Sequence, residues 1–208
     1  MTTNDIIFPM AVQTETKVEA AYGPKPRRPP SHRVVAPDLA TTISPSSSEQ
    51  HGHLDNLECV IFLDVDGVLH PPNPKHERLF FRTSCMDLLK KICTESNCKI
   101  VLSTTWRLHE QGRATLAAKL AEHGCPGFVS RTPSIAQFQR PREILAWVNK
   151  HRPLTWCAID DWPLHEDARM KGHFVQTRPR YGLQPDTAAR VLSMLAAQRG
   201  EATEGAQR

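Results

Sequence analysis

From Leu57 onward, short apolar runs alternate with longer segments in which apolar residues recur every three or four positions. The short runs predict strands at Cys59–Val65, Lys99–Thr104, Gly127–Ser130, Thr155–Ile159 and His173–Gln176. The periodic segments predict helices at Cys85–Ile92, Ala114–Glu122, Arg142–Lys150 and Pro185–Ala197. Strands that alternate with helices favour an α/β fold, here a Rossmann-like parallel sheet with helices on both faces.

Residues 1–55 differ in composition from the rest and predict a disordered, Pro/Ser-rich N-terminal arm. Gly23–Pro30 contains four prolines and three basic residues, and Thr41–Ser48 consists almost entirely of Ser, Thr and Pro. Such segments bury too little apolar surface to offset the entropy lost on ordering. We interpret them either as a tether or partner-binding arm or as a dispensable tail. The folded domain is expected at residues 56–198, followed by a polar tail at 199–208.

Three of the predicted strands run directly into acidic or hydroxyl residues. These residues are Asp64 and Asp66 after the first strand, Ser103 and Thr104 after the second, and Asp160 and Asp161 after the fourth. In a parallel α/β sheet, ligands bind beyond the carboxyl ends of the strands. We therefore expect these side chains around one crevice.

The four carboxylates need a positive partner, because acids this close together cannot all ionise side by side. Mg²⁺ fits best, since it prefers oxygen ligands and commonly bridges carboxylates to phosphate groups. The candidate metal ligands are Asp64, Asp66, Asp160 and Asp161. On a phosphate ester, one acid would attack phosphorus and a second would protonate the leaving oxygen, while a hydroxyl and a cationic side chain hold the phosphoryl oxygens.

The motifs D-V-D-G-V at 64–68, L-S-T-T-W-R at 102–107 and I-D-D at 159–161 resemble those of the haloacid dehalogenase (HAD) superfamily of phosphatases and phosphotransferases. The resemblance covers residues 57–197. With R-P-R-E-I-L-A-W-V at 140–148, the chain is most similar to small HAD domains, some of which are associated with RNA-repair proteins. The resemblance implies that residues 56–198 form a HAD-like catalytic domain.

The resemblance also implies a role for each matching residue. Asp64 matches the family's nucleophile and Asp66 its general acid/base, while Ser103 matches the hydroxyl that binds the phosphoryl group. Asp160 and Asp161 match the metal-binding pair, with Asp160 expected as the direct ligand.

The family's remaining motif is a cation, usually lysine, and this chain offers arginines instead. Arg140 is the best match and Arg142 the alternative; arginine is always charged and suits bidentate phosphate contact. Thr104 and Arg107 are further candidates for phosphate binding. The pair Trp106 and Arg107 has two interpretations: a substrate-side arginine, or a tryptophan in the core with the arginine packed against it.

Three aromatic side chains near the motifs are harder to interpret. His70 and His76 flank a proline loop close to the first motif, and we expect them to be exposed and inert rather than substrate contacts. Trp162 follows the acid pair, and we expect it to close the crevice rather than to stack on a base.

The short segment between Asp66 and the second strand leaves no room for a large cap domain, so we expect an open site that admits a bulky substrate. The expected function is a Mg²⁺-dependent phosphomonoester hydrolase that acts through an aspartyl-phosphate on Asp64, on a phosphorylated substrate such as a nucleotide or a nucleic-acid end. The alternatives are a phosphotransferase, or a catalytically weak phosphate- or partner-binding module. The net charge of +4 permits a nucleic-acid partner, but there is no dense basic stripe with interleaved aromatics.

The remaining features concern the cellular environment. Met1–Val12 has no basic start, and the early apolar run Ile6–Val12 is far shorter than the ~20 residues that span a membrane. We expect a soluble, cytoplasmic protein with no membrane contact. The six cysteines include no C-x-x-C pair, and we expect them to be reduced and structural.

Overall fold

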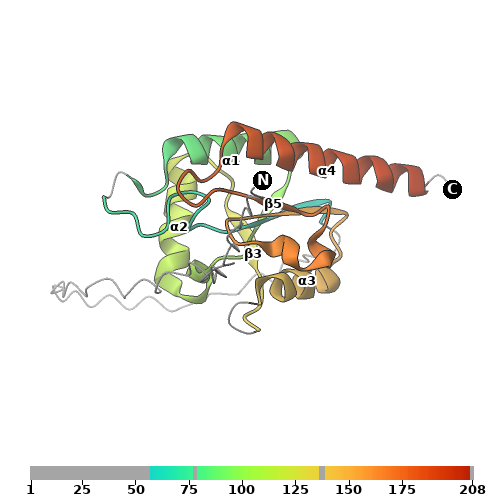
Figure 1. Cartoon of the computed structure of the whole chain (residues 1–208), viewed down its shortest axis with the longest axis horizontal. Coiled ribbons are helices and arrows are strands. Elements are labelled where there is room, and N and C mark those ends of the chain that lie inside the picture. The colour runs from blue at the N-terminus through green and yellow to red at the C-terminus, as the bar shows by residue number, and fades with distance from the viewer. Residues whose placement is uncertain (1–56, 77–78, 136–138, 207–208) are drawn as a thin grey trace, which may run out of the picture. The chain divides into compact units, whose positions relative to one another are not determined.

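A computed structural model of the chain describes residues 57–76, 79–135 and 139–206 (Figure 1). The N-terminal arm predicted at 1–55 lies outside these residues, so that prediction stays untested.

The described residues contain one five-stranded sheet in which every strand pair is parallel. Its strands are β1 Cys59–Leu63, β2 Lys99–Leu102, β3 Phe128–Arg131, β4 Thr155–Asp160 and β5 Phe174–Gln176. The order across the sheet is β3-β2-β1-β4-β5. The chain moves outward from β1 in one direction and then returns to start β4 on its other side. That reversal is the point at which doubly wound sheets bind ligands.

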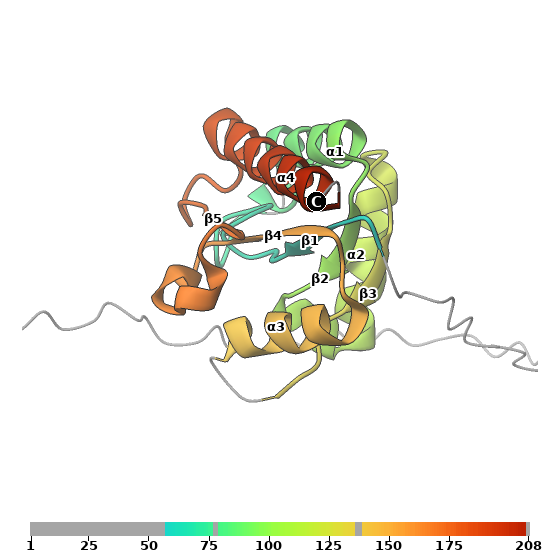
Figure 2. The same ribbon diagram turned by 90° about the vertical axis from the view of Figure 1, so that its right-hand side faces the viewer.

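Helices cover both faces of the sheet (Figure 2). They are α1 Thr83–Ser96, α2 Glu110–Glu122, α3 Arg140–His151 and α4 Pro185–Ala206. Along β1, Ile61 and Leu63 pack into the core shared with α1, α2 and α4, whereas Val60 and Phe62 pack into the core shared with α3. Alternate residues of a strand point to opposite faces, so one buried strand supplies both cores. The prediction of an α/β parallel sheet is confirmed.

The helices extend beyond their predicted bounds: α1 runs to Ser96 rather than Ile92, α3 begins at Arg140 rather than Arg142, and the largest differences are in α2 and α4. Helix α2 begins at Glu110, four residues before the expected Ala114. The apolar pattern does not predict this first turn because Gly112 interrupts it. Glu110 nevertheless favours a helix start here, since a negative charge is stabilised at the positive N-terminal end of the helix dipole. Helix α4 continues to Ala206 rather than ending at Ala197, so the tail predicted at 199–208 is helical over 199–206.

Tertiary hydrogen bonds account for the longer α4. The Gln198 amide accepts from the Trp156 backbone N–H at 2.9 Å, and donates to the carbonyls of Trp156 at 3.0 Å and Gly172 at 2.9 Å. The Arg199 guanidinium donates to the Ser96 carbonyl at the end of α1. These contacts hold the helix against β4 and α1. They are made by polar side chains, so the apolar periodicity of the sequence does not predict them.

The connections between the motif strands are short. The described residues between β1 and β2 contain a loop and α1, and those between β2 and β4 contain a short 3₁₀ helix, α2, β3 and α3. Within the described part of the chain, no cap domain interrupts the fold. None of the helices that the structure describes has the length and apolar character needed to cross a membrane. All six cysteines are buried and unbridged in this structure.

Candidate active site

The sheet register places three motif residues side by side. Beyond the last paired residues, the Ser103 N–H still donates to the Leu63 carbonyl at 2.9 Å, and the Asp64 N–H donates to the Ile159 carbonyl at 3.1 Å. Ser103, Asp64 and Asp160 therefore stand on adjacent strands at the carboxyl edge of the sheet. The predicted convergence of the strand ends is observed.

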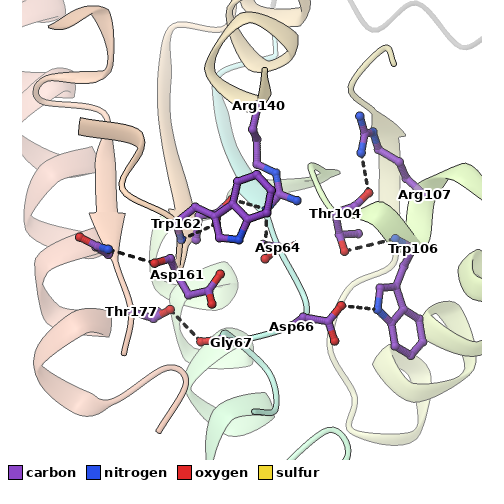
Figure 3. Close-up of polar contacts among 12 residues, drawn as sticks. Asp64, Asp66, Gly67, Thr104, Trp106, Arg107, Arg140, Asp161, Trp162 and Thr177 are labelled. Atoms are coloured by element: carbon purple, nitrogen blue, oxygen red, sulfur yellow. Dashed lines mark hydrogen bonds and ion pairs between the residues drawn. The ribbon is translucent and has the colours of Figure 1, made fainter. Parts of the chain in front are cut away.

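Three carboxylates form a compact cluster at this edge (Figure 3). One oxygen each from Asp64, Asp160 and Asp161 lies within 4.8 Å of the others, and the first two side chains are buried. Gly67 makes the approach of Asp161 feasible: a Cβ at this position would lie 2.4 Å from Asp161 Cγ, and its φ of +81° also favours glycine. The absence of a side chain at Gly67 thus lets the turn after the first motif pack closely against the Asp161 side chain.

Strand β5 and the residue after it hold these two segments in place. The Gln176 side-chain amide donates to the Asp161 carbonyl at 2.9 Å, and the Thr177 hydroxyl donates to the Gly67 carbonyl at 2.8 Å (Figure 3). Sequence reasoning missed both residues. Their only signal was a position at the end of the weakest predicted strand.

Arg140, the first residue of α3, is the cation that reaches the acids. Its Nη1 lies 3.1 Å from Asp64 Oδ2 and 2.6 Å from Asp160 Oδ2. The Trp162 ring covers the guanidinium, with 4.8 Å between Arg140 Cζ and the ring centroid (Figure 3). Arg142, two residues later, points away and is exposed, because two residues turn a helix by roughly 200°. Of the two predicted alternatives, the structure brings Arg140 to the site.

The pKa of each clustered acid is raised above the usual range of an aspartate. Burial raises the pKa of Asp160 to about 8, although Arg140 opposes the shift, and burial together with repulsion from Asp64 raises the pKa of Asp161 to about 7. Burial also raises the pKa of Asp64, against the effect of Arg140. With all three carboxylates ionised, the cluster and Arg140 carry a formal charge of −2. A divalent cation bound by oxygen ligands would neutralise that charge.

Two hydroxyls stand next to the acids. Burial raises the pKa of Asp64, and the neighbouring Thr104 hydroxyl opposes part of that effect. The same hydroxyl accepts from the Trp106 backbone N–H at 3.3 Å. Ser103 Oγ is buried and finds no hydrogen-bond partner within the described residues. A buried polar group without a hydrogen-bond partner lowers the stability of the folded protein by roughly 1–3 kcal/mol. A phosphoryl oxygen is the kind of acceptor that would satisfy it.

Asp66 is not part of the acid cluster. Its Oδ2 accepts from the Trp106 indole at 2.9 Å, and its Oδ1 lies 3.0 Å from His70 Nε2. Figure 3 shows the carboxylate turned toward the indole. The structure therefore does not bring the predicted fourth metal ligand to the other three acids, because both carboxylate oxygens already have neighbouring donors.

Comparison with known families agrees with this geometry. The sequence model of the family described as the HAD domain in Swiss Army Knife RNA repair proteins matches residues 60–188. The chain belongs to this family. Membership implies hydrolase- or phosphatase-type activity. Searches of the curated proteins and of the solved structures found no significant match.

Arg107 of the HAD domain is engaged by several groups of its own fold. It is buried, and its nitrogens donate to the carbonyls of Thr104, Thr132 and Pro133 and to the Glu143 carboxylate, the last at 2.7 Å. These contacts engage Nε, Nη1 and Nη2 together, so of the two interpretations they favour an arginine packed within the fold over a substrate-side arginine. Arg107 joins the segment after β2 to the start of α3.

His70 of the HAD domain is buried, which corrects the expectation of an exposed and inert side chain. Its relative exposure is 0% and it contacts Asp66, whereas His76 is exposed as expected. Trp162 packs over Arg140, consistent with a residue that closes the crevice. The position of His70 four residues after Asp66 was the one available signal, and its burial depends on Phe80 and Phe81 from the next segment.

Proposed function

We propose that this HAD domain is a Mg²⁺-dependent phosphomonoester hydrolase that acts through an aspartyl-phosphate on Asp64. The observation that carries the proposal is the position of Asp64. It ends the central strand, lies within 4.8 Å of the ligand oxygens of Asp160 and Asp161, and is paired with Arg140. An acid placed between a cation site and a guanidinium can receive a phosphoryl group whose charge both would offset.

The proposed reaction has two steps. A carboxylate oxygen of Asp64 attacks phosphorus, a new P–O bond forms, and the bond to the leaving oxygen breaks as Asp66 gives that oxygen its proton. Asp66 then takes a proton from a water molecule, which attacks the same phosphorus and releases inorganic phosphate and the free Asp64 carboxylate. The Asp66 side chain is 40% exposed and so is open to a substrate.

The cluster of Asp64, Asp160 and Asp161 would hold the metal. Its three oxygen ligands, its excess negative charge and the raised pKa of Asp160 and Asp161 all fit a divalent cation. Bound Mg²⁺ would offset charge on the phosphoryl oxygens and on the acids. Independently of the metal, Arg140 supplies a fixed guanidinium beside Asp64, and Ser103 and Thr104 supply hydroxyls.

The proposed substrate is a nucleotide or a nucleic-acid end. Two observations support this substrate class. No cap domain interrupts the described residues, so a bulky phosphate ester has access to the strand ends. The family description also places such domains in RNA repair proteins.

The second candidate is a catalytically weak phosphate- or partner-binding module. The observation that favours it is the position of Arg140, an arginine where the superfamily usually has lysine, which pairs with the proposed nucleophile and with Asp160 at once. A buried, doubly paired guanidinium could hold phosphate without allowing turnover. A phosphotransferase would share the first chemical step and differ in its acceptor.

Phosphate release separates these candidates. Purified protein is incubated with p-nitrophenyl phosphate, nucleotides, sugar phosphates and 5′- or 3′-phosphorylated oligonucleotides, with Mg²⁺ or with chelator, beside Asp64→Asn. The exposed Asp87 on α1 provides the matched control, Asp87→Asn. We expect Mg²⁺-dependent release that only Asp64→Asn abolishes, and the best substrate defines the class. Mg²⁺ and phosphate binding without release would favour the binding module.

A further inference from the structure

The Asp66 carboxylate is held by two aromatic donors, Trp106 and His70, and the family resemblance assigned neither of them this role. The Trp106 indole N–H donates to Oδ2 at 2.9 Å and His70 Nε2 lies 3.0 Å from Oδ1 (Figure 3). Each carboxylate oxygen therefore has its own partner, on the side away from the three clustered acids. The side chain nevertheless stays 40% exposed. This combination restricts rotation while leaving the carboxyl group accessible.

His70 is fixed in position and in the direction of its hydrogen bonds. The Phe81 backbone N–H donates to Nδ1 at 3.5 Å, so Nδ1 acts as the acceptor and Nε2 carries the proton directed at Asp66. The imidazole is fully buried, with the rings of Phe80 and Phe81 each 5.0 Å away between centroids. A donor packed in this way cannot follow a carboxylate that rotates elsewhere.

Trp106 is fixed by a separate set of contacts. It belongs to the 3₁₀ helix η2 Thr105–Leu108, and its backbone N–H donates to the Thr104 hydroxyl at 3.3 Å. Its ring lies 5.6 Å from Phe81 and 5.8 Å from His70, in edge-on geometry. The two donors therefore pack against each other and against a common phenylalanine. The assembly of His70, Phe81 and Trp106 joins the segment after β1, the residues just before α1 and the segment after β2.

We propose that His70 and Trp106 are positioning residues that hold the Asp66 carboxyl group apart from the metal-binding acids and aim it at the leaving oxygen. This inference rests on the proposed hydrolase function. An acid free to rotate beside a bound cation would be drawn toward it and lost as a proton donor. Two donors that are packed against each other and against Phe81 oppose that rotation. Neither His70 nor Trp106 touches the substrate, and both act through Asp66.

A leaving-group series tests the proposal, because a proton donor matters most when the leaving oxygen is strongly basic. The values of kcat/KM are measured for aryl and alkyl phosphates of increasing leaving-group pKa, for wild type, His70→Phe and Trp106→Phe. This parameter includes loss of the leaving group and excludes the later hydrolysis of the intermediate. Both variants keep an aromatic ring and remove the donor. We expect kcat/KM to fall roughly tenfold or more for alkyl phosphates and much less for p-nitrophenyl phosphate.

Matched variants separate positioning from packing. His76→Phe makes the same change at an exposed site in the same loop, and Trp147→Phe removes an indole donor that serves Ser130, 3.0 Å away and outside the acid cluster. We expect wild-type leaving-group dependence in both controls. His70→Gln, whose amide can donate from nearly the same place, should recover part of the loss with alkyl phosphates. Mg²⁺ affinity no weaker than that of wild type in every variant, measured by calorimetry, would show that the three clustered acids still bind the metal.

A uniform loss of kcat/KM across the series, with no change in leaving-group dependence, would overturn the proposal and leave His70 and Trp106 as structural residues. The same conclusion would follow if His70→Gln were no better than His70→Phe. If wild-type protein released no phosphate from any compound while Asp64→Asn still bound Mg²⁺ less tightly than wild type, the hydrolase function would fail and the positioning proposal with it. Phosphate release by wild type therefore shows whether the positioning proposal alone has failed or the hydrolase function has failed as well.

Discussion

Arg140 shows how much of the site depends on a single side chain. Its guanidinium pairs with two of the three clustered carboxylates, and Trp162 covers it from the other side. The sequence left Arg140 and Arg142 as alternatives, since both are arginines in the same motif. The helical turn of α3 distinguishes them: Arg140 faces the strand ends, whereas Arg142 lies on the exposed side of the helix.

Replacing Arg140 with methionine should destabilise the protein at pH 8.5, where Asp160 and Asp161 are largely ionised. Removal of one partner from a buried ion pair leaves uncompensated charge, which costs about 3–5 kcal/mol. Urea unfolding without Mg²⁺ would measure the loss, and Arg140→Lys should lose less because it keeps the charge. Equal stability of wild type and Arg140→Met would contradict the pairing.

Gly67→Ala should damage the metal site as well as strain the backbone. The new Cβ would lie 2.4 Å from Asp161 Cγ, and the positive φ costs a non-glycine residue roughly 1–2 kcal/mol. Gly172 is a matched control, with a φ of +78° and no heavy atom within 4 Å of the position that an alanine Cβ would take. We expect both variants to lose stability, and only Gly67→Ala to lose Mg²⁺ affinity in calorimetry. Unchanged affinity would show that Asp161 can move without cost.

Other residues lay beyond sequence reasoning for a physical reason. His70 and Arg107 stand in polar, loop-like stretches, and their burial results from aromatic rings and carbonyls that other segments supply. Local sequence patterns carry no information about such partners. In contrast, Asp64, Asp160 and Asp161 could be predicted to converge, because they stand at the carboxyl ends of two buried parallel strands.

At the level of elements, the apolar runs in the sequence predicted all five strands. The ends of the predicted strands then indicated where the acidic residues meet. The ends of helices were harder to predict, since hydrogen bonds from elsewhere in the fold determine them. Helix α4 extends past Ala197 where Gln198 contacts the backbone of Trp156 and Gly172. Helix α3 likewise begins at Arg140, so that its first residue belongs to the site.

Gln198→Ala should therefore destabilise the domain although its side chain is only half-buried. The change removes three hydrogen bonds to backbone groups, and we expect a loss of about 1–3 kcal/mol in the free energy of unfolding. Gln111→Ala at an exposed position of α2 is the matched control and should change stability by less than about 0.5 kcal/mol. Similar urea midpoints for the two variants would show that these hydrogen bonds do not stabilise α4.

For the whole molecule, alternating patterns predicted a parallel α/β sheet, and the structure added the strand order and the distribution of helices. The order β3-β2-β1-β4-β5 places the motif strands β2, β1 and β4 next to one another. No local pattern encodes that adjacency, which follows from the handedness of the crossovers and from which apolar faces meet. The consequence is a concentration of negative charge at one edge of the sheet.

That charge should make stability depend on pH and on metal. The pKa values of Asp160 and Asp161, about 8 and about 7, lie above the ordinary aspartate value of about 3.9, so the folded state keeps protons that the unfolded state releases. Without metal, stability should be greatest below pH 4 for these two groups and fall as pH rises toward 8. Mg²⁺ should oppose this fall, so its stabilising effect should be larger at pH 8.5 than at pH 6.

Thermal unfolding at these two pH values, with Mg²⁺ and with chelator, checks the expectation. Asp160→Asn is the control, since it removes one of the two groups that titrate and should reduce both the pH dependence and the effect of Mg²⁺. A Tm that rises with pH without metal, or a Mg²⁺ effect that is the same at both pH values, would contradict the proposed metal cluster.

The most direct test of the account is to trap the covalent intermediate on Asp64. Protein is mixed with a radiolabelled phosphate ester in the presence of Mg²⁺, quenched in acid, and examined for bound phosphate by peptide mapping. We predict a label that hydroxylamine removes, that maps to the peptide containing Asp64, and that is absent from Asp64→Asn and from metal-free protein. Steady release of phosphate with no label on wild type, or an equal label on Asp64→Asn, would contradict the assignment of Asp64 as the nucleophile.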